Sequence, residues 1–131
     1  MPIEYSIDHA RRLVVARGLG VFSHDDVFRY QREVWSQAAV SGYDELVDMT
    51  DVSEIAAPLP DGSRMKQLAS EAAAQDPPTN AGKFAIVAPN PLMFGLGRQY
   101  ETYRELNPRS KKTVRVFHTL QDALTFLGIE P

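Results

Sequence analysis

The chain has 131 residues, of which 44% are hydrophobic and 24% charged, the composition of a globular domain with a core of its own. Its formal net charge of -3 excludes a general attraction to nucleic acid or to an anionic membrane surface, and the absence of cysteine excludes disulfides, thiolate metal sites and thiol nucleophiles. No apolar run approaches the ~20 residues of a membrane span, and the N-terminus lacks the pattern of a signal peptide. We therefore expect a single cytoplasmic domain over residues 1–131, with no nucleic-acid partner and no membrane span.

The N-terminal part of the chain predicts a hairpin followed by a helix. Residues 3–8 alternate apolar and polar side chains, as in a half-exposed strand, and Leu13–Ala16 is a continuous apolar run suited to a strand that is covered on both faces. Ser23 and Asp26 form a capping-box pattern at the start of a helix, which Gly42 is expected to end.

The rest of the chain alternates strands with helices. Three more strands are expected at residues 46–49, 83–89 and 113–118. They are followed by a helix through Met65, a helix over Pro91–Leu106 and a helix over 120–127, while residues 51–62 read as a loop. This order predicts the α/β class: a mixed five-stranded sheet with an antiparallel N-terminal edge strand, otherwise largely parallel, and four helices.

Three segments of this pattern resemble a known superfamily. They read "LVDMTDV" (Leu46–Val52), "AIVAPNPLMFGLGRQYE" (Ala85–Glu101) and "VFHTLQDALTFLG" (Val116–Gly128). Together they are similar to the STAS-like superfamily, and more closely to the small stand-alone bacterial SpoIIAA-like proteins of unassigned role. The resemblance implies a fold of that type and a regulatory or signalling module that binds a protein partner.

Ser63 is the candidate phosphoacceptor that the resemblance suggests. Antagonists of the superfamily are switched by phosphorylation of a serine beside the start of the second helix, in a sequence close to Asp-Ser-Ser-Gly. The corresponding "PDGSRM" places glycine before the serine instead of after it, with Asp61 as the nearest acid. We favour the simpler interpretation, in which Ser63 caps its helix.

Four polar residues at the predicted carboxyl ends of the strands form a candidate ligand rim: Asp48, Asp51, Asn90 and His118. The two carboxylates could hold a divalent cation, and His118 could act as a general base. No third acid, nucleophile elbow or metal-spaced histidine pair accompanies them. We therefore predict no metal, no cofactor and no catalytic residue here, with Asp48 bonded to nearby amides and Asp51 organising its turn. The basic run at residues 109–112 is expected to be a solvated loop.

The helix over Pro91–Leu106 contains two glycines, each of which costs roughly 1 kcal/mol relative to alanine. On a helical projection Leu92, Leu96, Tyr100 and Tyr103 share the core-facing stripe, with Met93 at its margin, and the glycines flank it. The absence of side chains at positions 95 and 97 predicts that the helix lies close to the sheet or to a neighbouring helix.

Phe94 is expected on the opposite, polar face of that helix, beside Arg98 and Glu101. An exposed aromatic near an arginine is typical of an interface anchor. The first hypothesis is therefore a non-enzymatic binding module that meets a protein partner, or a second copy as a homodimer, through this face.

Two other functions stay open. A carrier of a small apolar ligand or lipid is the alternative, because Met49, Met65, Met93 and Phe94 could line an internal space. The third hypothesis is an enzyme that uses the rim of Asp48, Asp51 and His118.

Overall fold

A computed structural model describes residues 3–56 and 61–129. Their sheet has five strands in the order β1-β2-β3-β4-β5: β1 (Ile3–Asp8), β2 (Leu13–Phe22), β3 (Asp44–Ile55), β4 (Lys83–Val87) and β5 (Thr113–Phe117). The helices are α1 (His24–Val34), α2 (Gly62–Ala74), α3 (Pro91–Leu106) and α4 (Leu120–Leu127). The strand β1 is antiparallel to β2 and every other pair is parallel, which confirms the predicted fold class and its antiparallel edge.

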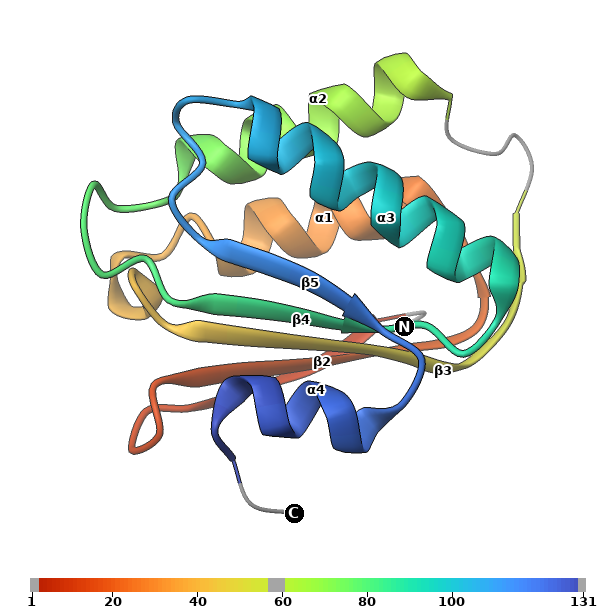
Figure 1. The fold of residues 1–131 in the computed structure, drawn as a ribbon, viewed down its shortest axis with the longest axis horizontal. Coiled ribbons are helices and arrows are strands. Elements are labelled where there is room, and N and C mark those ends of the chain that lie inside the picture. Colours follow the sequence, from red (N-terminus) through yellow and green to blue (C-terminus); the bar gives the residue numbers. More distant parts are fainter. Residues whose placement is uncertain (1–2, 57–60, 130–131) are drawn as a thin grey trace.

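The helices are divided unequally between the two faces of the sheet. The parallel strands follow one another in chain order, so crossovers of one hand place α1, α2 and α3 on the same face. Only α4, which follows the last strand, lies on the other face (Figure 1). The three-helix face therefore holds most of the core, and this is where an internal site could form.

Each face of the sheet has its own apolar core. On the three-helix face, strand residues such as Phe84 and Ile86 pack with Phe28 of α1, Leu68 of α2 and Tyr100 of α3. On the other face, the core joins α4 to β2, β3 and β4; its buried members are Leu13, Leu46, Ala85, Val87, Ala123 and Leu127. Both faces of β4 are covered, which explains its nearly continuous apolar sequence.

Two strands are longer than the sequence predicts. The strand β2 continues to Phe22 and β3 continues to Ile55, because the two pair with each other as far as their ends, across two register shifts. Residues 51–55, which read as loop, are therefore strand. Pro58 and Pro60, on which the loop prediction rested, lie outside the described residues.

The first helix is shorter than the sequence predicts. It begins with the expected capping box of Ser23 and Asp26 but ends at Val34, and a separate 3-10 turn follows at residues 38–40. The prediction that Gly42 ends the helix is wrong. Trp35 is buried, and its indole N–H donates to a buried carboxylate on β3, which fixes the chain in a turn after α1.

Candidate functional site

The two aspartates of the candidate rim have structural partners. Asp48 accepts a hydrogen bond from the backbone N–H of Thr50 at 2.9 Å, so the expected bond to a nearby amide is confirmed. Asp51 forms an ion pair with Arg17 of the neighbouring strand. The structure therefore shows no cation-binding arrangement of these two carboxylates, and no cluster of three or more metal-ligating side chains exists within residues 3–56 and 61–129.

The other rim residues lie where the chain leaves neighbouring strands toward opposite faces. After β4 it enters α3, and after β5 it enters α4 on the other side of the sheet (Figure 1). In open α/β sheets, ligands often bind in a crevice at such a point. Here the rings of Phe94 and His118 are stacked, with centroids 3.9 Å apart and planes within 7°. Asn90 accepts from two backbone N–H groups as the N-cap of α3.

The expectation that Phe94 faces away from the protein is therefore wrong. Besides stacking on His118, Phe94 packs against the core of the three-helix face and is only partly exposed. Arg98 is exposed, as expected, whereas Glu101 is buried. Of the three predicted interface residues, only Arg98 is freely presented to solvent.

The helix α3 is rotated relative to the predicted stripe. Its buried face contains Met93, Tyr100, Glu101 and Arg104, while Leu92 is 51% exposed. Gly97 lies inside this face: a Cβ built on it would approach Val116 of β5 to 3.1 Å. A Cβ on Gly95 would meet nothing within 4 Å. The prediction of close approach is thus confirmed at Gly97 and wrong at Gly95.

Ser63 is exposed in the first turn of α2, but it does not cap the helix. The N-cap is Asp61, whose carboxylate accepts from the N–H of Arg64 at 2.9 Å. The capping interpretation of Ser63 is therefore wrong. Its role as a phosphoacceptor stays a prediction.

A buried polar cluster lies under the C-terminal part of α1. Glu45 of β3 accepts from the hydroxyl of Tyr30 at 2.7 Å and from the indole of Trp35 at 3.1 Å. The Nζ of Lys112 lies 3.6 Å from Glu45 and 3.5 Å from the centre of the Trp35 ring. Burial raises the pKa of Glu45, an effect that the charge of Lys112 opposes, and burial lowers the pKa of Lys112. Lys112 is thus part of the core, and the prediction of a solvated basic loop is wrong for it.

A second buried cluster joins α3 to the loop after α2. Asp76 accepts from the guanidinium of Arg104 at 2.6 Å and from the backbone N–H of Lys111 and Lys112. Arg104 also donates to the hydroxyl of Tyr100 at 2.9 Å. Burial raises the pKa of Tyr100 to about 12. These groups satisfy one another. They could not be predicted from the sequence, because charged residues are ordinarily assigned to the solvent-exposed face of a helix.

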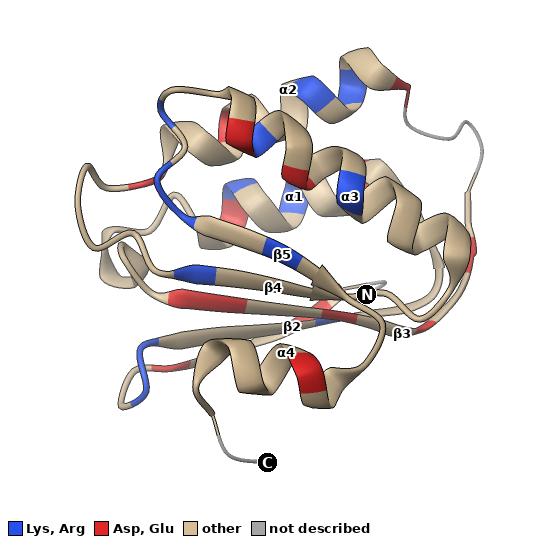
Figure 2. Cartoon of the chain, in the orientation of Figure 1, with Lys and Arg blue, Asp and Glu red and all other residues tan. Residues whose placement is uncertain are grey.

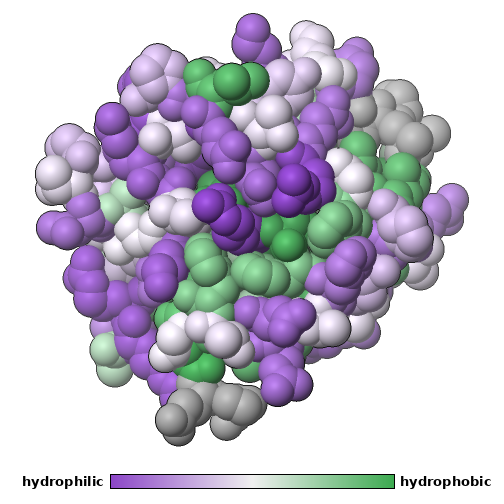
Figure 3. Space-filling view, in the orientation of Figure 1, coloured by the Kyte–Doolittle hydropathy of each residue, from purple (hydrophilic) through white to green (hydrophobic). Residues whose placement is uncertain are grey.

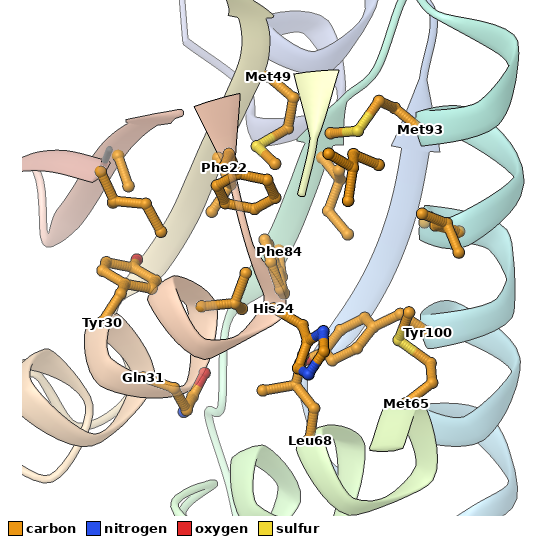
Figure 4. A pocket seen from close by; sticks show the side chains of 18 of the residues that line it. Phe22, His24, Tyr30, Gln31, Met49, Met65, Leu68, Phe84, Met93 and Tyr100 are labelled. Atoms are coloured by element: carbon orange, nitrogen blue, oxygen red, sulfur yellow. The ribbon is translucent and has the colours of Figure 1, made fainter. Parts of the chain in front are cut away.

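An apolar cavity of about 120 Å³ lies between the sheet and the three helices. Four strands, β1 to β4, and the three helices of this face contribute to its wall. The strands supply Phe22, Val47 and Met49 among others, and the helices supply Met65 and Met93 (Figure 4). The structure places these three methionines around the space that the carrier hypothesis requires. Phe94, the fourth residue expected there, is not among the lining residues.

The polar side chains in the wall of the cavity are mostly engaged elsewhere. The hydroxyl of Tyr30 is bonded to Glu45, and that of Tyr100 is bonded to Arg104. His24, the first residue of α1, also lines the cavity, and its Nδ1 is buried with no hydrogen-bond partner among the described residues. The wall therefore combines an apolar surface with two polar groups that have no hydrogen bond to the described residues, the ring nitrogen of His24 and the side-chain amide of Gln31.

Charged side chains of both signs are interspersed over the surface of the molecule. Figure 2 shows acidic and basic residues alternating along α3, and Arg98 and Glu101 are paired there at 3.6 Å. Within the described part of the chain, no helix has the length and apolar character required to cross a membrane.

Comparison with known proteins supports the fold. No family model matches the chain, and no curated protein does. Among solved structures, the chain is similar to an uncharacterized protein from the DUF3478 family with a SpoIIAA-like fold, from Shewanella loihica PV-4. The two are 17% identical, the match covers 95% of this chain and 93% of the other, and the TM-score is 0.56. The SpoIIAA-like fold that the sequence resemblance implied is thereby confirmed; at this identity the similarity concerns the fold alone.

Proposed function

We propose that this protein is a cytoplasmic, non-enzymatic binding module whose internal cavity takes up a small apolar molecule. The observation that carries the proposal is the cavity between the sheet and α1, α2 and α3, with its apolar wall and its three methionines. Methionine side chains are flexible and polarizable, so they can adapt to ligands of different shape. We prefer the carrier hypothesis to an interface on α3, because Phe94 stacks on His118 and is not free to anchor a partner.

The volume of the cavity sets the size of the ligand. An engineered apolar cavity of about 150 Å³ stays dry and binds benzene, so a space of about 120 Å³ suits a molecule of about one ring or a short branched chain. A ligand that fills the cavity supplies contacts that its lining side chains lack, so binding is expected to stabilise the fold. A complete lipid would not fit without movement of the helices.

Toluene and the methionine methyl groups provide the test. In protein labelled with ¹³C at the methionine methyls, saturating toluene is expected to shift the signals of Met49, Met65 and Met93, because all three line the cavity. Val47→Phe places a ring in the cavity and is expected to abolish these shifts. Val21→Phe is the matched control, because Val21 is 55% exposed on β2.

The proposal is wrong if saturating toluene leaves all three methyl signals unmoved in the folded wild type. Native mass spectrometry of freshly purified protein adds a second readout, since a co-purifying mass identifies the ligand.

Self-association is a second candidate function, and a patch of apolar surface favours it. Figure 3 shows apolar side chains gathered around the end of β5, between the first turns of α3 and α4. Leu92 is 51% exposed and Leu120 is 42% exposed, and the partly buried Phe117 lies in the same region. We propose this patch, in place of Phe94, Arg98 and Glu101, as the contact surface of a homodimer.

Light scattering coupled to size-exclusion chromatography tests the dimer. Leu92→Glu is expected to convert a dimer into a monomer. Leu106→Glu is the matched control, because Leu106 is 74% exposed at the other end of the same helix. A wild-type protein that elutes as a monomer at high concentration, or a Leu92→Glu variant that stays dimeric, contradicts the proposal.

A further inference from the structure

His24 brings an unpaired polar atom into the wall of the cavity. It is the first residue of α1, and Figure 4 shows its ring pointing from that helix toward the side chains of Leu68 and Tyr100. Its Nδ1 is buried and has no hydrogen-bond partner within the described residues. In the same described part of the chain, Oε1 of Glu101 is likewise buried without a partner, but Glu101 does not line the cavity. A buried polar atom without a partner is unfavourable, so Nδ1 gains from any ligand that can bond it.

The surroundings of the ring indicate what kind of group it can bond. The other ring nitrogen, Nε2, lies 3.9 Å from the exposed carboxylate of Asp25. This separation is too long for a hydrogen bond, and Arg64 donates to the same carboxylate oxygen at 2.7 Å. We take the neutral tautomer that carries its proton on Nε2, the ring nitrogen on the side of Asp25. Nδ1 then presents a lone pair toward the interior, and its partner must be an O–H or N–H donor.

Water is a poor partner at this position. A buried water needs two to four polar partners. Besides Nδ1, the wall offers the side-chain amide of Gln31, seven residues further along α1, which makes no hydrogen bond to the described residues. The hydroxyls of Tyr30 and Tyr100 are bonded to Glu45 and Arg104. A molecule that is apolar over most of its surface, with one donor group, satisfies both the wall and Nδ1.

We infer that the ligand is a compact apolar molecule of about one ring that carries a single hydroxyl, and that this hydroxyl donates to Nδ1 of His24. The inference rests on the proposed function and specifies the class of its ligand. His24 is the residue that distinguishes such a molecule from a plain hydrocarbon of the same shape.

Phenol and toluene provide the test because they differ only in a hydroxyl against a methyl group. The ratio of their affinities is measured for the wild type, for His24→Leu and for His118→Leu, a control histidine outside the cavity wall. Loss of one net hydrogen bond is expected to weaken phenol relative to toluene about fivefold in His24→Leu. The ratio in His118→Leu is expected to match that of the wild type.

Ring-nitrogen NMR of the wild type gives a second readout that needs no variant. The chain has three histidines, and phenol is expected to move the Nδ1 signal of His24 while leaving those of His9 and His118 in place. Toluene at the same occupancy is expected to move it much less.

The outcomes separate the two proposals. If toluene and phenol both bind, but the affinity ratio is the same in His24→Leu and the Nδ1 signal does not respond, the assignment of the hydroxyl to His24 is wrong while the cavity remains a binding site. If neither molecule binds the folded wild type, the proposed function itself fails. If His24→Leu does not fold, the ring-nitrogen measurement alone decides.

Discussion

Gly95 and Gly97 of α3 provide a matched pair of substitutions with opposite expected effects. At Gly95 an added Cβ meets nothing within 4 Å, so Gly95→Ala is expected to gain the helix propensity of alanine, about 1 kcal/mol. For a chain of this length, that corresponds to a rise in Tm of roughly 3–5 °C. Both glycines lie in the interior of the helix, so the gain from propensity is the same at the two positions.

At Gly97 the same gain is opposed by a steric cost. The new Cβ would lie 3.1 Å and 3.3 Å from the two γ-methyl carbons of Val116 and 3.8 Å from Ile86. Val116 is buried and β-branched, so its side chain cannot rotate away, and α3 must lift from the sheet. Overpacking of this kind costs about 1–3 kcal/mol, so we expect Gly97→Ala to be neutral or destabilising by up to ~2 kcal/mol.

Urea unfolding of the two single variants measures the difference directly. A double-mutant cycle with Val116→Ala tests the contact. Gly97→Ala is expected to be less destabilising in the Val116→Ala background than in the wild type. If Gly97→Ala stabilises the protein as much as Gly95→Ala does, the close approach of α3 to β5 is not what requires glycine at position 97.

The buried polar clusters give three further predictions, each checked by urea unfolding. Lys112→Met is expected to lower the free energy of unfolding by about 3–5 kcal/mol, because it leaves Glu45 without its cation. The double variant Lys112→Met with Glu45→Gln is expected to lose less than the sum of the two single variants. Asp76→Ala is expected to cost a similar amount, since it leaves the guanidinium of Arg104 buried without a carboxylate, and Asp76→Asn to cost less. Tyr100 has its pKa raised from 10.0 to about 12 when folded, so the folded state keeps a proton that the unfolded state loses above pH 10. Stability is therefore expected to fall with pH above 10, by about 1 kcal/mol at pH 11 from this group, and Tyr100→Phe to remove that part of the slope.

The elements that were predicted well have local sequence causes. The capping box of Ser23 and Asp26, the N-cap Asn90 before Pro91, and the left-handed Gly128 after α4 each fix a helix end through residues within one turn. Alternation of strands and helices then led to the correct fold class. The ends of β2 and β3 were missed because pairing between the two strands, and not local sequence, extends them to Phe22 and Ile55.

The face of α3 was predicted only in part. Tyr100 is buried and Leu96 and Tyr103 pack against the core, as expected, whereas Leu92 is exposed. The buried positions recur as Met93, Gly97, Tyr100, Glu101 and Arg104, a helical spacing that a glycine and two charged residues conceal. The reasons for burial lie partly in the tertiary structure: Val116 packs against Gly97, and Asp76 pairs with Arg104. A prediction from hydrophobicity alone therefore placed the buried stripe of α3 too close to Leu92.

The cavity could be suspected from the sequence but not located. Methionine at three core positions is compatible with an internal space, although methionine fills gaps in ordinary cores equally well. Its wall comes from four strands and three helices, so no local pattern describes it. The unpaired Nδ1 of His24 is likewise invisible in the sequence, where His24 is only the residue after an N-cap.

If the cavity serves to bind a ligand, a side chain that fills it should abolish binding and should not lower the stability of the protein. Val47 lines the cavity, and in Val47→Phe the added ring has empty space to enter, so the usual penalty of overpacking should not apply. We expect this variant to be at least as stable as the wild type without ligand, to show no stabilisation by toluene, and to gain more than Val21→Phe, which adds the same ring at the surface. Thermal unfolding with and without toluene measures all three. A loss of 1–3 kcal/mol in Val47→Phe, the ordinary cost of overpacking, would show that the side chains around Met49 and Met65 already close the space. An aromatic ring could not then be accommodated there, whether it arrived as a side chain or as a ligand.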